Sequence, residues 1–159
     1  MANPRVKSTL SAEAQKITGE ALQDALVDLI NLSLLAKQAH WNLVGRNFRS
    51  LHLALDEVVD TARNWMDVIA ERAVAIGVTP DGRAPTVARA SGAAAIDAGW
   101  LQDTDVVQSF IDIYSGVIGR MRGRLSETAE ADEVSHGLFI DATAELEKQH
   151  WMFQVEHDV

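Results

Sequence analysis

The stretch KQAHWNLVGRNFRSLHLALDE, residues Lys37–Glu57, contains the end of one predicted helix and the start of the next. Its two histidines, His40 and His52, are twelve residues apart, with a turn-forming segment around Gly45 between them. His52 and Asp56 are spaced four residues apart, so their side chains share one face of a helix. If the two helices pack antiparallel across this short link, His40 joins that pair.

Outside this stretch, apolar residues recur at three- and four-residue spacing and predict four long helices. The first covers about residues 19–43, with Asp24 and Asp28 on its polar stripe. The second is capped by Asn47 or Ser50 and runs to Ile76, where Gly77 follows. The third opens at Asp103 or Thr104, and the fourth covers about residues 133–156.

A long connection, residues 78–102, separates the second predicted helix from the third and holds two of the three prolines. Its 25 residues reach about 80 Å when extended, more than the length of a helix of about 42 Å. Such a crossover lets helices two and three run parallel, and it has room for a short helix. We therefore predict an all-α, ferritin-like four-helix bundle over residues 19–156, a tail over 1–18 and a C-terminal end over 157–159.

The composition limits which metal ligands, partners and locations the chain can have. The 159-residue chain has no cysteine, which excludes disulfides, thiolate catalysis and iron–sulfur clusters, so a metal would need histidine and carboxylate ligands. A formal net charge of −9 favours gathering cations and argues against binding duplex DNA. Since no apolar run reaches about 18 residues, no membrane span is expected. The N-terminus lacks the apolar core of a signal peptide, so we expect a cytoplasmic location.

A second pair with four-residue spacing, Asp67 and Glu71, lies further along the second predicted helix. Both pairs fit a divalent metal, although such stripes are commonly solvated helix faces with ion pairs. Asp56 and Asp67 are eleven residues apart, or about 16 Å along one helix, too far to bind one ion. Either one pair alone binds metal, or the two pairs meet across a twofold axis between subunits.

Two Glu-x-x-His segments suggest a di-iron site within one bundle, because di-iron bundles use this motif. They are Glu133–His136 and Glu147–His150. Both fall on the fourth predicted helix, fourteen residues or about 21 Å apart. They cannot form one site within the bundle.

The histidine stretch and the later segment DVIAER, residues 67–72, resemble the signature of the Dps family of mini-ferritins. The resemblance rests on the HWN tripeptide at His40, the second histidine at His52 and the D-x-x-x-E before Arg72. It covers about residues 21–151 and is least close over 78–102. For Lys37 and Arg72 themselves we predict surface ion pairs.

The resemblance implies a ferroxidase site shared by two subunits. One subunit would supply His40, His52 and Asp56, and its twofold mate would supply the other two ligands. Those two ligands are Asp67 and Glu71. Trp41 and Trp151 match aromatic residues that the family keeps near the site, and packing in the core is the alternative reading for both.

The same resemblance implies a homo-oligomeric shell of twelve subunits that oxidises Fe(II), commonly with hydrogen peroxide rather than dioxygen, and stores ferric mineral. It also suggests that Asp132 or Glu133 lines a threefold pore. The first eighteen residues carry only Arg5, Lys7 and Lys16 as basic side chains, so DNA binding, and with it a nucleoid location, is expected to be weak or absent. Two alternatives remain: a DNA-compacting shell in which metal oxidation is secondary, and a cage whose site holds zinc.

Overall fold

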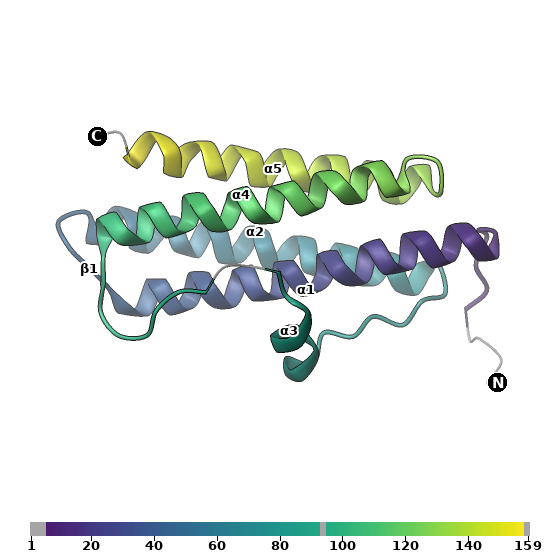
Figure 1. Ribbon diagram of the computed structural model, residues 1–159, viewed down its shortest axis with the longest axis horizontal. Helices are drawn as coiled ribbons and strands as arrows, with labels where there is room; N and C mark the ends of the chain where they lie inside the picture. The colour runs from purple at the N-terminus through teal and green to yellow at the C-terminus, as the bar shows by residue number, and fades with distance from the viewer. Residues whose placement is uncertain (1–5, 93–94, 158–159) are drawn as a thin grey trace.

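The computed structural model describes residues 6–92 and 95–157 of the chain. Four long helices lie side by side, and a connection with one short helix runs between the second and third of them (Figure 1). The elements are α1 (Ala12–Asn42), β1 (Leu43–Val44), α2 (Phe48–Ala75), α3 (Ala84–Ala90), β2 (Leu101–Gln102), α4 (Asp103–Thr128) and α5 (Glu133–His157). The predicted all-α four-helix bundle, with a long crossover between the second and third long helices, is confirmed.

The start of α1 differs from the prediction, because the helix begins at Ala12 rather than near Gly19. Ser11 is its N-cap, and the Ser11 Oγ accepts a hydrogen bond from the Ala14 backbone N–H (3.2 Å). This bond satisfies one of the N–H groups that a helix start leaves free. About two turns of α1 therefore lie within the segment predicted as a tail over residues 1–18.

The two short strands define how the crossover runs. β1 pairs with β2 in parallel, with Leu43 opposite Leu101 and Val44 opposite Gln102. β1 leads through a short turn into α2, and β2 leads directly into α4. Both helices therefore begin at the same end of the bundle and run parallel, as the length of the connection predicted (Figure 1).

Asp103 connects the starts of α2 and α4 through hydrogen bonds. Its Oδ2 accepts a hydrogen bond from the Asn47 backbone N–H (2.8 Å), and its Oδ1 accepts one from the Thr104 N–H (3.0 Å). Gly45 has φ +135°, and a Cβ there would lie 2.3 Å from the Asp103 Cγ, so only glycine fits. The Asn47 side chain, predicted as a cap of α2, makes no capping hydrogen bond.

The core is formed by apolar side chains from all four long helices, with α1 packed mainly on α2 and α4 mainly on α5. Phe110, Tyr114 and Phe139 are its largest fully buried side chains. The apolar residues that recur along the second predicted helix are buried, except that Trp65 is only half-buried. They are Leu51, Leu55, Val58, Ala62, Trp65, Ile69, Ala73 and Ile76. Within residues 6–92 and 95–157, no helix combines the length and apolar character needed to cross a bilayer.

Asp28 corrects the prediction of a polar stripe on the first helix, because its side chain is buried rather than solvated. Its Oδ2 accepts hydrogen bonds from Arg120 Nε (2.9 Å) and Arg124 NH2 (2.7 Å), both on α4. Its Oδ1 accepts a hydrogen bond from the Gly92 backbone N–H (3.3 Å), just beyond α3. One buried carboxylate therefore joins α1, α4 and the crossover.

Candidate metal centre

The structure brings His40, near the end of α1, against His52, in the second turn of α2. Their rings are stacked, with centroids 3.6 Å apart and an angle of 22° between the planes. The short link between α1 and α2 makes the two helices antiparallel neighbours, which is the arrangement that the sequence required for this approach.

Reciprocal hydrogen bonds hold the two imidazoles in one tautomer. His40 Nδ1 lies 2.9 Å from the carbonyl oxygen of His52, and His52 Nδ1 lies 3.1 Å from the carbonyl oxygen of His40. Because a carbonyl oxygen only accepts, each Nδ1 must carry the proton and donate it. In the neutral rings this leaves both Nε2 lone pairs available for a metal ion, the usual arrangement of a metal-binding histidine.

Asp56 adds a carboxylate beside the two rings. Its Oδ1 lies 3.4 Å from His40 Nδ1 and forms an ion pair with the ammonium group of Lys37 on α1. The hydrogen bond from Lys37 is the largest influence on Asp56 and lowers its pKa; burial opposes this effect, and the nearby histidines add to it. The ion pair predicted for Lys37 is therefore present, and it lies inside the candidate centre.

Asp67 and Glu71 lie further along α2 with exposed side chains. Within the part of the chain that the structure describes, no group of three or more histidine or acidic side chains is placed to hold one metal ion. This finding includes His40, His52 and Asp56, which a single subunit brings near one another without arranging all three around one ion. Nor does a single subunit join Asp67 and Glu71 to them. Their contribution from a second copy remains a prediction.

Three large aromatic side chains near the centre or on α5 are exposed. Phe48 packs beside His52, with ring centroids 5.0 Å apart, and is itself exposed. Trp41, the neighbour of His40, is 68% exposed, and Trp151 on α5 is 57% exposed. Core packing, the alternative reading for both tryptophans, does not hold within the single subunit, because neither is covered by it. Their position near a completed metal site stays a prediction.

Of the two residues predicted to line a pore, Asp132 is buried and Glu133 is exposed. The Asp132 Oδ2 accepts hydrogen bonds from Arg72 NH2 (2.7 Å) and from the Ser135 backbone N–H (3.2 Å) at the start of α5. Burial alone would raise the pKa of Asp132, but the hydrogen bonds from Ser135 and Arg72 outweigh it and lower the pKa. Asp132 is thus paired within its own subunit, and the ion pair of Arg72 is partly buried.

The two Glu-x-x-His segments take part in separate contacts. His136 Nδ1 donates a hydrogen bond to the Leu125 carbonyl oxygen (3.0 Å). Glu147 accepts one from Arg122 Nε (2.7 Å), and the His150 ring stacks on a core tyrosine. As expected from their separation, they do not form one site.

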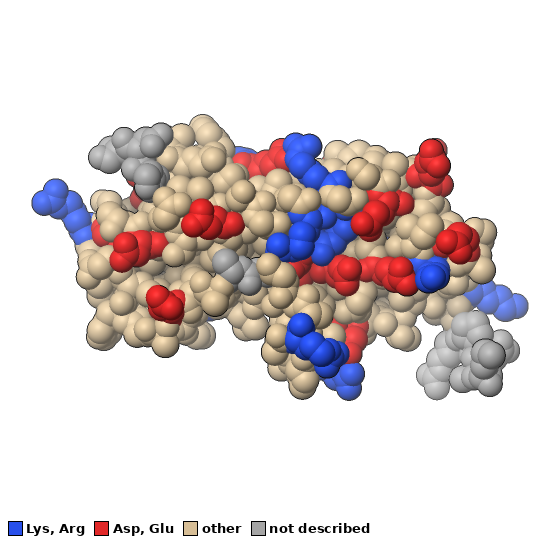
Figure 2. All heavy atoms as spheres, in the orientation of Figure 1, with Lys and Arg blue, Asp and Glu red and all other residues tan. Residues whose placement is uncertain are grey.

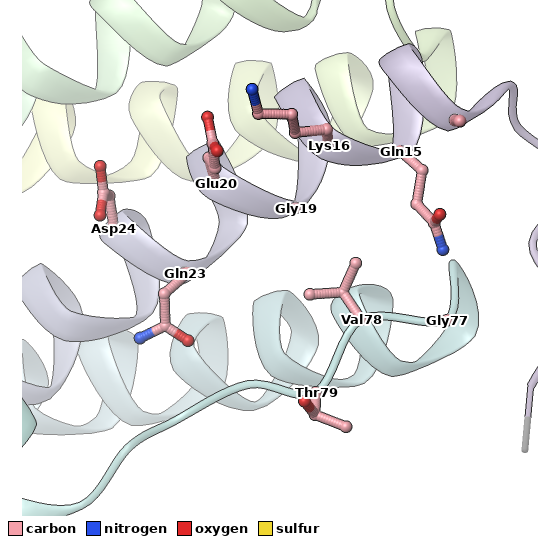
Figure 3. A pocket seen from close by; sticks show the side chains of 10 residues that line it. Gln15, Lys16, Gly19, Glu20, Gln23, Asp24, Gly77, Val78 and Thr79 are labelled. Atoms are coloured by element: carbon pink, nitrogen blue, oxygen red, sulfur yellow. The ribbon is translucent and has the colours of Figure 1, made fainter. Parts of the chain in front are cut away.

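A surface hollow of about 670 Å³ lies away from these groups, between the first turns of α1 and the segment after α2 (Figure 3). Gln15, at one end of it, donates a hydrogen bond to the Ile76 carbonyl oxygen (2.7 Å). Lys16 and Glu20 line it, and its lining holds no histidine. His40 lies towards the opposite end of α1, so this hollow is not part of the candidate centre.

The fold agrees with the comparisons to known proteins. A family profile described as "Ferritin-like domain" matches residues 19–157, so the chain is a ferritin-like protein. A "DNA protection during starvation protein" from Agrobacterium fabrum is 30% identical over 155 residues, which cover 97% of this chain and 96% of that relative. The chain belongs to the Dps family.

Two further comparisons support this assignment. "DNA protection during starvation protein 2" from Deinococcus radiodurans is 33% identical over 142 residues, which cover 89% of this chain but 59% of that longer relative. The structure of Dps from Microbacterium arborescens in the high iron form superposes with a TM-score of 0.92 at 26% identity. That match covers 97% of this chain and all of the other.

Proposed function

We propose that this protein oxidises Fe(II), preferentially with hydrogen peroxide, and stores the ferric product inside a shell of twelve subunits built from twofold dimers. The observation that carries the proposal is the pair of imidazoles, His40 and His52. Their Nδ1 protons are bound by backbone carbonyl oxygens, which leaves the Nε2 lone pairs for a metal ion, and Asp56 Oδ1 lies 3.4 Å from His40 Nδ1. Iron here is the substrate. Fe(II) accepts imidazole and carboxylate ligands, and added carboxylates favour the ferric product.

The centre is completed between subunits in this proposal. Asp67 and Glu71 of a twofold mate approach His52 and Asp56, which one straight helix cannot arrange by itself. The exposure of Asp67, Glu71 and Trp41 supports a partner surface at this place. Large exposed apolar side chains on α5 support further contacts between copies. They include Val134, Ile140, Trp151, Met152 and Val155.

Two iron ions at each centre supply the two electrons that reduce one hydrogen peroxide molecule to water. Each Fe(II) gives one electron to the same hydrogen peroxide molecule, its O–O bond breaks, and two protons complete two water molecules. Because both electrons arrive together, no hydroxyl radical is released. With dioxygen as the alternative oxidant, the same two electrons and two protons would produce hydrogen peroxide.

Two variants test the shared centre. His52→Ala and Asp67→Ala should each slow peroxide-driven Fe(II) oxidation, followed by ferric absorbance, by about tenfold or more. Asp60→Ala, an exposed carboxylate on the same helix, is the matched control and should leave the rate unchanged. Mixed dimers of the two slow variants hold one intact centre of two, and should regain activity.

The outcomes separate the alternatives. Wild-type rates in both single variants would contradict the assignment of these residues. Slow variants whose mixture regains no activity would restrict the centre to one subunit. A protein that binds zinc tightly and oxidises no Fe(II) would favour the zinc-holding cage. The names of the relatives favour a second function, the protection of DNA during starvation. The net charge of −9 argues against protection by direct binding.

A further inference from the structure

Among the residues that the structure describes, Asp56 is the carboxylate beside the histidine pair, and a cation is already bound to it. The Lys37 ammonium group is bound to Asp56 Oδ1, and His40 Nδ1 lies 3.4 Å from the same oxygen. The two side chains of the pair are 24% and 41% exposed, for Lys37 and Asp56 respectively. The contact is therefore at the edge of the centre, within reach of solvent.

A divalent ion bound to this carboxylate competes with that ammonium group. Metal–oxygen bonds are about 2 Å long, so an ion on Asp56 lies within a few ångströms of the Lys37 charge unless the lysine moves. Two like charges at that separation repel each other strongly where they are partly shielded from water. The lysine stem has four carbons and rotates freely, and its partial exposure gives the ammonium group a path into solvent.

We infer that Lys37 is an internal counter-cation of Asp56 that a metal ion must displace, and that it thereby sets how tightly the centre binds divalent ions. This inference rests on the proposed function. Displacement weakens the binding of every divalent ion by the same factor. Ions that are held weakly, such as Mg²⁺, then fail to occupy the centre, whereas ions that bind imidazole well still enter it.

The test measures metal binding rather than oxidation. Co²⁺ is titrated calorimetrically into the assembled wild-type protein and into Lys37→Met, which keeps the side-chain length and removes the charge. Lys37→Met should bind Co²⁺ about tenfold more tightly, since the partly exposed ion pair no longer has to be broken. Lys37→Arg keeps a cation and should not bind more tightly than the wild type. Lys148→Met, an exposed lysine on α5, is the control and should match the wild type.

Mg²⁺ gives a second readout, as competition against Co²⁺. Millimolar Mg²⁺ should reduce Co²⁺ binding in Lys37→Met and have little effect in the wild type. If Lys37→Met does not assemble, Lys37→Gln takes its place. Unchanged or weaker Co²⁺ binding in the neutral variant overturns the inference, and weaker binding would instead make Lys37 a positioning residue for Asp56.

A third variant separates this failure from failure of the proposed function. His52→Ala should weaken Co²⁺ binding if the proposed centre exists. If His52→Ala binds Co²⁺ as tightly as the wild type does, the proposed metal centre is absent. Both the proposed function and the role of Lys37 are then wrong. If His52→Ala binds weakly while Lys37→Met equals the wild type, the centre stands and only the role of Lys37 is wrong.

Discussion

Asp132 precedes α5 and accepts hydrogen bonds from Ser135 and Arg72, so one carboxylate ties α2 to the start of the last helix. Because its pKa is lowered in the folded protein, the ionised form contributes stability above the pKa of the unfolded chain, about 3.9. That contribution is lost as the pH falls through the folded pKa. A helix cap of this kind contributes about 1 kcal/mol, and the pairing with Arg72 adds to it.

Asp132→Asn should therefore lower the free energy of unfolding by about 1–2 kcal/mol at pH 7. Urea unfolding at pH 7 and pH 3 measures this loss, and the difference from the wild type should shrink at the lower pH. Glu133→Gln is the matched control, because Glu133 is exposed at the same helix start, and should cost less than about 0.5 kcal/mol. Equal losses in both variants, or a loss independent of pH, would contradict this account.

At the level of single residues, spacing predicted the meeting of His40 and His52, because a short link between two helices leaves few arrangements. The partners of Asp28 could not be predicted in this way. Arg124 lies 96 residues away in the sequence, and no local pattern reveals that the two side chains meet. The pairing of Asp132 with Arg72 could not be predicted for the same reason, since Arg72 belongs to another helix 60 residues away. The pore position of Asp132, which the family resemblance implies, stays a prediction.

At the scale of the elements, Asp28 connects α1 with α4 and the crossover through hydrogen bonds. The residue is 1% exposed, and its side chain accepts three of them. Asp28→Asn keeps the shape but removes the charge that two guanidinium groups face. Leaving those groups without a counter-charge should cost about 3 kcal/mol or more in the free energy of unfolding, measured with urea. Asp24→Asn, an exposed position one turn earlier, should be close to neutral. A loss below about 1 kcal/mol at Asp28 would contradict the structural role assigned to it.

Helix ends were predictable where a strong local signal marked them. Gly77, with φ +81°, follows α2 as predicted, since the left-handed conformation favours glycine. The start of α1 was missed because the Ser11 cap precedes a mixed polar segment whose apolar periodicity is weak. β1 and β2 were not predicted, because two residues are too few to show the alternation typical of a strand.

At the scale of the whole molecule, the net charge is the property that most directly affects DNA binding. Acidic side chains extend along the face drawn in Figure 2, and basic ones gather near its middle and on α3. The chain has 23 acidic against 14 basic residues, and duplex affinity depends on cationic contacts with phosphate. Linear duplex DNA should therefore remain unshifted in a gel at neutral pH and about 0.15 M salt. A shift that persists at that salt would overturn the expectation and direct attention to Arg5, Lys7 and Lys16.

The parallel pairing of β1 with β2 also implies an order of folding. His40 and His52 are 12 residues apart in the chain, whereas Asn47 and Asp103 are 56 apart. Because closing a longer loop costs more entropy, the α1–α2 hairpin should form first and the Asp103 contacts later. Pulse-labelled hydrogen exchange during refolding should then protect amides of α1 and α2 before those of Leu101 and Gln102; simultaneous protection would contradict this order. As the chain leaves the ribosome, the two imidazoles would thus already face each other before α4 and α5 have been synthesised.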